Sequence, residues 1–245
     1  MLVLCYNKTM RNILIIDNHL QKFCNKCSVF REDVRAKYDV AVRAHDNLPK
    51  KLDEYSHIVL TGGGGRVAMD DPTLPHLQKL IRQAVREEIP ILGICFGHQM
   101  IAAALEGHDA IESYVNPETG WFRMTRHGES RLLAGLPHNF YAFEHHHDDV
   151  VSLPKDFMVT ASSARCKIEA YEHKLLNIYG VQFHPEISKR TAKTIITQHI
   201  TRHLPSNWLG RHERGRMPFS RHIGEVIFEN FYATERPKKK ATSKK

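Results

Sequence analysis

The chain has 245 residues, of which 42% are hydrophobic and 25% are charged. This balance is typical of a soluble globular protein and excludes collagen-like, wholly disordered and disulfide-scaffold classes. No apolar run approaches the roughly 18 residues that a membrane span requires. The five cysteines are an odd number without framework spacing, which favours a reducing compartment. We therefore expect a cytoplasmic protein with no membrane partner.

The net charge of +8 is concentrated near the C-terminus. Residues 1–188 carry −2, whereas residues 189–222 carry +7 and residues 236–245 carry +6. A terminal lysine run is usually a solvated tail, and no motif for RNA or DNA binding accompanies it, so nucleic acid is an unfavoured partner. We expect a disordered leader at 1–10 and one domain over 11–235, with a basic insertion at 189–222 and a disordered tail at 236–245.

Apolar runs alternate with helical patterns along the chain. Strands are expected at 12–17, 38–44, 57–60 and 90–94. A helix is expected to begin near Gln21, and helical spacing covers 75–88 and 97–105. Strand-like runs then follow at 140–143, 157–163, 168–171 and 177–183, and helices at 191–203 and 224–231. This order predicts an α/β fold with a doubly wound, mostly parallel open sheet flanked by helices, and a smaller antiparallel segment in the second half.

Cys95 lies where an expected strand turns directly into a helix, with Gly93 and Gly97 two residues to either side. This is the thiol counterpart of the nucleophile elbow, in which a tight turn lifts the side chain out of the carboxyl edge of the sheet. The start of a helix also favours negative charge on the sulfur. The alternative, a buried structural cysteine, stays open on this pentapeptide alone.

Two further segments supply the other groups that acyl transfer by a thiol needs. His184 and Glu186 follow an expected strand, and they provide a base and a group to orient it. The run TGGGG at 61–65 follows another strand, and its backbone N–H groups can stabilise an oxyanion. A phosphate-binding loop is a competing interpretation of this run, but the Lys-Ser/Thr of a P-loop is missing. A merely flexible turn is the other alternative.

Taken together, the segments GICFGHQ, QFHPE and TGGGG resemble the class I (triad) glutamine amidotransferase family, and within it the glutaminase subunits of GMP synthetases. The resemblance extends over about residues 11–188 and resumes at 223–232. The run FEHHHDDVVSLPKDF at 143–157 is similar to the S-H-x-D loop of that group. Asp17 and Gln21 match its D-x-G-x-Q turn, whereas His19 and Leu20 replace the usual small residues there.

The resemblance implies a reaction and a role for each matched residue. Cys95 attacks the amide carbon of glutamine, His184 is the base, and Glu186 holds His184. The backbone N–H groups of Phe96 and Gly63 stabilise the oxyanion. Residues that contact the substrate glutamine are Gln99 and, through their backbone, His145, His146 and His147. The γ-glutamyl thioester is hydrolysed to glutamate, and neither a metal nor a cofactor is needed in this chain.

The ammonia that is released requires an acceptor enzyme. The sequence has no ATP-pyrophosphatase motif, so the resemblance implies a separate ATP-pyrophosphatase synthetase subunit, carrying ATP and magnesium, that aminates XMP to GMP. An amidotransferase of the anthranilate or aminodeoxychorismate type and a stand-alone γ-glutamyl hydrolase remain alternatives. A degenerate binding or regulatory module with a nucleic-acid-binding tail is an alternative from another class. The insertion at 189–222 is either a partner-docking element or lid, or a solvated insertion.

His145–His147 and the pair Cys24 and Cys27 also suggest zinc. Each is half of a site without a complementary pair at ligand spacing. We therefore expect no metal site in this chain.

Overall fold

The structure is a computed structural model that describes residues 12–19, 39–44, 46–65, 67, 74–201 and 221–236. Several expectations from the sequence lie outside these residues. They are the leader, the helix near Gln21, the pair Cys24 and Cys27, residues 202–220 of the insertion, and the tail beyond Arg236.

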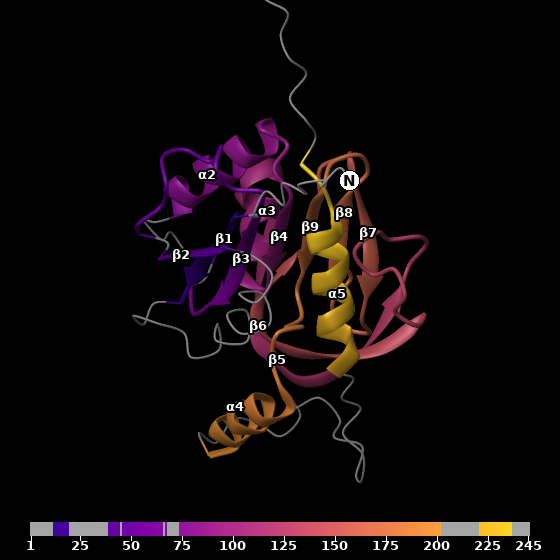
Figure 1. The fold of residues 1–245 in the computed structure, drawn as a ribbon. Helices are drawn as coiled ribbons and strands as arrows, with labels where there is room; N and C mark the ends of the chain where they lie inside the picture. Colours follow the sequence, from indigo (N-terminus) through magenta and orange to yellow (C-terminus); the bar gives the residue numbers. More distant parts are fainter. Residues whose placement is uncertain are drawn as a thin grey trace, which may run out of the picture.

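In the part of the chain that the structure describes, nine strands form one mixed sheet (Figure 1) in the order β2-β1-β3-β4-β9-β8-β7-β5-β6. The parallel half consists of β1 (Asn12–Asn18), β2 (Asp39–Ala44), β3 (His57–Gly63), β4 (Ile91–Ile94) and β9 (Ile178–Val181). The antiparallel half consists of β5 (Ile111–Arg126), β6 (Asn139–Val150), β7 (Phe157–Ser162) and β8 (Ala170–His173). The predicted fold class is thereby confirmed.

Helices cover both faces of the central parallel strands, which fits the apolar runs of β1, β3 and β4. Leu14 and Ile16 of β1 pack on the side of α2 (Leu74–Arg86) and α3 (Phe96–Glu106). Ile13 and Ile15 alternate with them and pack on the side of α5 (Arg221–Ala233). Figure 1 shows α5 in front of the sheet, whereas α3 packs against β3, β4 and β9 on the other face, with α2 beside it. A short 3-10 helix, η2 (His108–Ala110), leads into β5.

The helix α4 (Lys189–Thr201) begins the basic insertion and stands at one end of the molecule (Figure 1). The buried side chains of α4 are Ala192, Ile195 and Ile196. They form a small core with Ile187 and with Trp121 and Phe143 of the antiparallel strands. Three exposed basic residues, Lys189, Arg190 and Lys193, lie on its surface. The insertion therefore starts as a helix anchored to β5 and β6, as its apolar spacing predicts.

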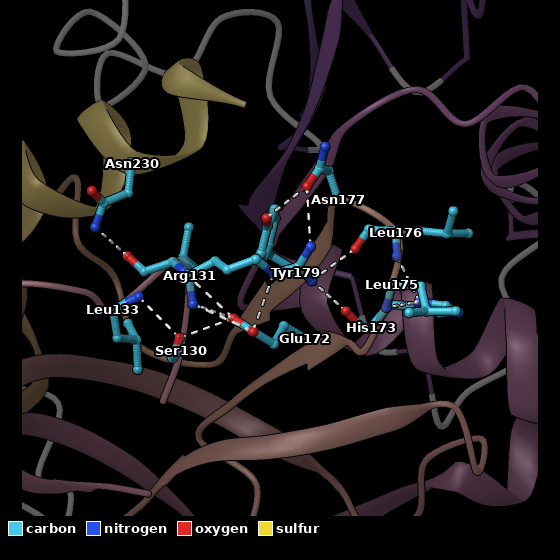
Figure 2. A network of polar contacts seen from close by, with 11 residues as sticks. Ser130, Arg131, Leu133, Glu172, His173, Leu175, Leu176, Asn177, Tyr179 and Asn230 are labelled. Carbon is cyan, nitrogen blue, oxygen red and sulfur yellow. Dashed lines mark hydrogen bonds and ion pairs between the residues drawn. The ribbon is translucent and has the colours of Figure 1, made fainter. Parts of the chain in front are cut away.

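A polar network joins the segment after β5 to the hairpin of β8 and β9 (Figure 2). The buried Glu172 carboxylate accepts hydrogen bonds from the Ser130 hydroxyl at 2.9 Å and from the backbone N–H of Arg131 at 3.1 Å. The Arg131 guanidinium donates to the Leu176 carbonyl at 2.9 Å and lies 5.3 Å from the ring centre of Tyr179. Glu172 thus organises a turn by satisfying donors that burial would otherwise leave unpaired.

Glu172→Gln is expected to lower the free energy of unfolding by about 2 to 3 kcal/mol, because the amide presents an N–H group to donors that need an acceptor. Urea denaturation of the variant and the parent chain measures this loss. Asn230, whose amide donates to the Leu132 carbonyl at 2.9 Å from the partly exposed side of this network, provides the control. Asn230→Ala is expected to cost about 1 kcal/mol, and equal losses in both variants would contradict the role given to Glu172.

Candidate active site

The turn at Cys95 joins β4 to α3 and has the geometry of a nucleophile elbow. Cys95 has a φ of 51° and a ψ of −107°, a backbone conformation that residues other than glycine rarely adopt. A β-carbon at Gly93 would lie 2.5 Å from the Gly97 carbonyl oxygen, and one at Gly97 would lie 2.4 Å from the Leu60 oxygen. Both flanking positions therefore require glycine. The turn places the sulfur at the carboxyl edge of the parallel strands, where α/β folds bind ligands.

His184 and Cys95 meet at the end of β3, although 89 positions separate them in the sequence. A β-carbon at Gly62 would lie 2.8 Å from Cε1 of His184 and 3.5 Å from Cβ of Cys95. The other side of the imidazole faces Glu186, whose Oε1 lies 2.7 Å from Nδ1 of His184. Cys95, His184 and Glu186 thus lie close together, and their roles as a triad stay a prediction. As candidates for the reacting groups, Cys95 and His184 are called the catalytic pair.

The electrostatic surroundings favour the charged form of His184. Burial alone lowers the pKa of the imidazole, but the Glu186 carboxylate and the Cys95 sulfur outweigh it and raise the pKa well above 6.5. The surroundings therefore favour a protonated imidazole between Glu186 and the Cys95 side chain.

Gly62→Ala is expected to reduce glutamine hydrolysis by about 10²-fold or more, because the added methyl group occupies the space of the His184 ring. Initial rates of glutamate formation measure the effect. Gly128, which has a φ of 55° and open space around it, provides a matched control. Gly128→Ala is expected to cost stability, through its backbone conformation, with little change in rate. A Gly62→Ala variant with the parent rate would show that the position of the His184 ring beside Gly62 is not required for glutamine hydrolysis.

The glycine loop that follows β3 lies against the elbow. A β-carbon at Gly65 would lie 3.0 Å from the Phe96 ring, and one at Gly63 would lie 2.3 Å from the Asn18 carbonyl oxygen. Asn18 in turn fixes the start of the loop, since its side-chain amide donates to the Thr61 carbonyl at 2.7 Å. The first turn of α3 also has N–H groups without acceptors inside the helix. The loop is thus packed against Phe96 and Asn18, and the oxyanion role of Gly63 and Phe96 stays a prediction.

The structure gives Gln99 and the three histidines more specific surroundings than the sequence does. The Gln99 amide donates to the Asp148 carbonyl at 2.6 Å and to Oε1 of Gln182 at 3.1 Å, so only its oxygen can face a substrate. His145 to His147 lie within β6 and not in a loop, and His145 and His146 pair with Thr119 and Glu118 of β5. The His145 carbonyl oxygen lies 3.8 Å from the Cys95 sulfur.

The three histidine side chains differ in their surroundings. Nδ1 of His145 lies 3.2 Å from the Thr119 hydroxyl, His146 is buried among carboxylates, and His147 is exposed. The contact that links this segment to the sulfur is made by its backbone, which therefore borders the candidate site. Among the residues described, no group of three or more His, Cys, Asp or Glu is arranged to hold a metal ion.

The sequence did not point to the carboxylates that surround His146. They are Glu118 on β5, Glu144 and Asp149 on β6, and Glu169 just before β8. The residue type alone does not show whether a glutamate or aspartate is buried or exposed. The sequence signal for burial here is the strand-like alternation in FEHHHDD. Its even-numbered residues, Glu144, His146 and Asp148, are all buried.

An α/β sheet with a cysteine elbow beside a histidine and a carboxylate defines a thiol hydrolase or acyltransferase class. Comparisons with known proteins agree with this. The profile of the family "Glutamine amidotransferase class-I" matches residues 14–203, so the chain belongs to the class-I glutamine amidotransferases. It is accordingly a glutamine-hydrolysing type of enzyme.

Individual relatives support the assignment. A protein of Thermoplasma volcanium that is named as one subunit of GMP synthase (glutamine-hydrolyzing) is 33% identical over 175 residues, which cover 71% of this chain and 83% of that protein. The protein of the same name from Methanopyrus kandleri is 33% identical over 185 residues, covering 71% and 89% respectively. The crystal structure of a glutamine amidotransferase from Thermotoga maritima, 22% identical, covers 91% of this chain and 96% of its own with a TM-score of 0.69, and it shows the same fold. None of the described helices is long and apolar enough to cross a membrane.

Proposed function

We propose that this chain is the glutaminase subunit of a two-part synthetase, in which Cys95, His184 and Glu186 release ammonia from glutamine for a separate partner. The observation that carries the proposal is the convergence of the Cys95 and His184 side chains at Gly62, with Glu186 2.7 Å behind the imidazole. Neither a metal nor a cofactor takes part in this half-reaction. The low cysteine count and the free thiols of Cys95 and Cys166 support a cytoplasmic location.

The reaction proceeds through two displacements at the amide carbon. The Cys95 thiolate adds to the carbonyl of glutamine, and the negative charge on oxygen is met by the N–H groups of Gly63 and Phe96. His184 gives its proton to the departing nitrogen, which leaves as ammonia, and a γ-glutamyl thioester remains on the sulfur. His184 then takes a proton from water, the hydroxide adds to the thioester, and glutamate leaves as the thiolate is restored. Glu186 keeps the imidazole oriented in both steps.

The Gln99 side chain and the backbone of His145 to His147 remain to hold the substrate itself. The Gln99 oxygen can accept a hydrogen bond from glutamine, since the Gln99 amide protons are already donated to Asp148 and Gln182. The backbone at His145 to His147 borders the sulfur and can bind the α-amino and carboxylate groups. Recognition would thus use fixed backbone atoms, which lose little conformational entropy on binding.

The acceptor of the ammonia is proposed from the relatives, which are named as subunits of a glutamine-hydrolysing GMP synthase. We propose that the partner is an ATP-pyrophosphatase subunit that binds ATP and magnesium and aminates XMP to GMP. The relatives, each named as one subunit of that enzyme, are covered over 83% and 89% of their own length, which supports a synthetase on a separate subunit. Nucleic acid has no place in this proposal.

The test is a reconstitution from the native cell. The full chain is used to capture its partner, and the complex is supplied with glutamine, ATP, magnesium and XMP. We expect an ATP-pyrophosphatase subunit to co-purify and GMP to form in step with glutamate. Amination of chorismate by the captured partner would instead support the anthranilate or aminodeoxychorismate type. Hydrolysis of γ-glutamyl peptides with no partner captured would support a stand-alone hydrolase.

A further inference from the structure

A buried group of charged side chains surrounds His146 behind the candidate site. Nε2 of His146 lies 3.1 Å from Oε2 of Glu118 and 3.2 Å from Oε2 of Glu144. Its other nitrogen, Nδ1, lies 3.1 Å from Oδ1 of Asp149. The His146 side chain is 1% exposed and that of Glu144 is 0% exposed. Burying so many charged groups is costly, and the close pairs between His146 and the carboxylates offset part of that cost.

Glu169 completes what we call the carboxylate cluster, which consists of Glu118, Glu144, His146, Asp149 and Glu169. Burial raises the pKa of Glu169 well above its ordinary value, and the charge of Glu144 adds to this. Burial lowers the pKa of His146, but the hydrogen bonds to Asp149, Glu118 and Glu144 outweigh it and raise the pKa. A protonated Glu169 can donate to Glu144, and an imidazolium between three carboxylates compensates their charge. Arg165, 3.1 Å from Glu118, closes the cluster toward solvent.

Glu144 and His146 of the carboxylate cluster lie on β6, and the main chain of the same strand contacts the catalytic pair. Side chains alternate along a strand, so Glu144 and His146 share one face while Phe143 and His145 belong to the opposite face. The main chain at these two opposite-face residues contacts both members of the pair. The Phe143 carbonyl accepts the backbone N–H of His184 at 2.8 Å, and the His145 carbonyl lies 3.8 Å from the Cys95 sulfur.

We propose that Glu144 and His146 are positioning residues, because the carboxylate cluster fixes the part of β6 that contacts both members of the catalytic pair. This proposal rests on the functional roles proposed for that pair. A shift of β6 by a fraction of an ångström would move the His184 backbone relative to the sulfur, and reacting groups tolerate little displacement. The proposal gives the Glu144 and His146 side chains no contact with substrate. Their effect is on how well the sulfur and the imidazole are paired.

The test measures the reactivity of the Cys95 sulfur directly, without glutamine or a partner. Iodoacetamide labels the full-length chain at pH 7 and pH 10, and mass spectrometry follows the peptide that holds Cys95. The parent chain sets the reference ratio of the rate at pH 7 to the rate at pH 10, and this ratio depends on how closely His184 is paired with the sulfur. In Glu144→Gln the ratio of the two rates is expected to fall about tenfold, which corresponds to one pKa unit.

Two control variants separate positioning from stability. Glu172→Gln makes the same substitution at a buried carboxylate of β8 that binds Ser130 and Arg131 rather than β6. It should lose stability but keep the parent ratio. Glu169→Gln replaces a protonated carboxyl group by an amide that can still donate to Glu144, so its ratio should stay within about twofold of the parent.

Cys166 reports on the fold inside the same experiment. It is buried beside the carboxylate cluster, and burial raises its pKa, so it should resist labelling in every variant that is folded. If Glu144→Gln exposes Cys166, the measurement is made with Glu118→Gln, which removes a cluster carboxylate nearer to solvent and is expected to lower the Cys95 ratio in the same direction.

The outcomes are distinct. The proposal is supported if the Cys95 ratio falls in Glu144→Gln, or in Glu118→Gln where that variant replaces it, while Cys166 stays protected and Glu172→Gln keeps the parent ratio. The proposal is overturned if that variant keeps the parent ratio, or if the ratio falls equally in Glu172→Gln. A chain that hydrolyses no glutamine in any complex refutes the proposed function, but the labelling ratio still decides whether the carboxylate cluster positions the pair.

Discussion

Cys95→Ala is expected to lower glutamine hydrolysis by about 10⁴-fold or more while leaving the fold intact. The sulfur is the atom that carries the γ-glutamyl group, so no neighbouring side chain can replace it. The methyl group of alanine fits the space of the side chain, and the strained backbone at this position is already present in the parent chain. Glutamate formation, measured in the complex with the partner, gives the rate, and circular dichroism confirms the fold.

Cys166→Ala is the matched control for this experiment. Cys166 is also a free, buried thiol, but no described contact links it to the catalytic pair. Its removal is expected to change the rate by less than about threefold, since deletion of a buried thiol is a packing change. Equal rates for Cys95→Ala and the parent chain would exclude Cys95 as the nucleophile.

His184→Asn is expected to reduce the rate by about 10³-fold to 10⁴-fold. Asparagine keeps a polar side chain beside Glu186 but has no group that takes up and returns a proton near neutral pH. The loss should appear mainly in kcat, because His184 acts on the leaving nitrogen and on water rather than in binding glutamine. Steady-state kinetics over a range of glutamine concentrations separates kcat from KM.

His127→Asn makes the same substitution at an exposed histidine that follows β5 and bonds to the Ser162 hydroxyl at 2.7 Å. It should leave both kinetic constants close to those of the parent chain. A rise in KM with an unchanged kcat in His184→Asn would assign His184 to substrate binding and remove it as the base.

The parallel half of the fold could be predicted from the sequence because its strands are buried on both faces. Runs such as NILIID and PILGI are almost wholly apolar, and β1, β3 and β4 lie where such runs predict them. The long strand β5 could not be predicted in the same way. It contains Pro117 and Gly120, and its pairing with β6 shifts register between Ser113 and Glu118.

The residues proposed to react at the candidate site could be predicted from the sequence, whereas the buried carboxylates behind them could not. Cys95 has glycines two residues to either side, and His184 is followed by Pro-Glu. Neighbouring residues of these types indicate local turns, so the turns at both positions can be recognised from the sequence. Glu118, Glu144 and Glu169 have no such signature, because their burial depends on strands that pair far along the chain. The histidines at 145 to 147 were expected in a loop for the same reason, since β5 had not been recognised as their partner strand.

The central claim is that a γ-glutamyl group passes through the Cys95 sulfur. The most direct measurement mixes the complex with excess glutamine, quenches it in acid and weighs the proteolytic peptide that contains Cys95. We predict that this peptide gains the mass of one γ-glutamyl group, and that the gain is absent in the peptide that contains Cys166. Turnover of glutamine with an unmodified Cys95 peptide, or with the group on another residue, would contradict the account.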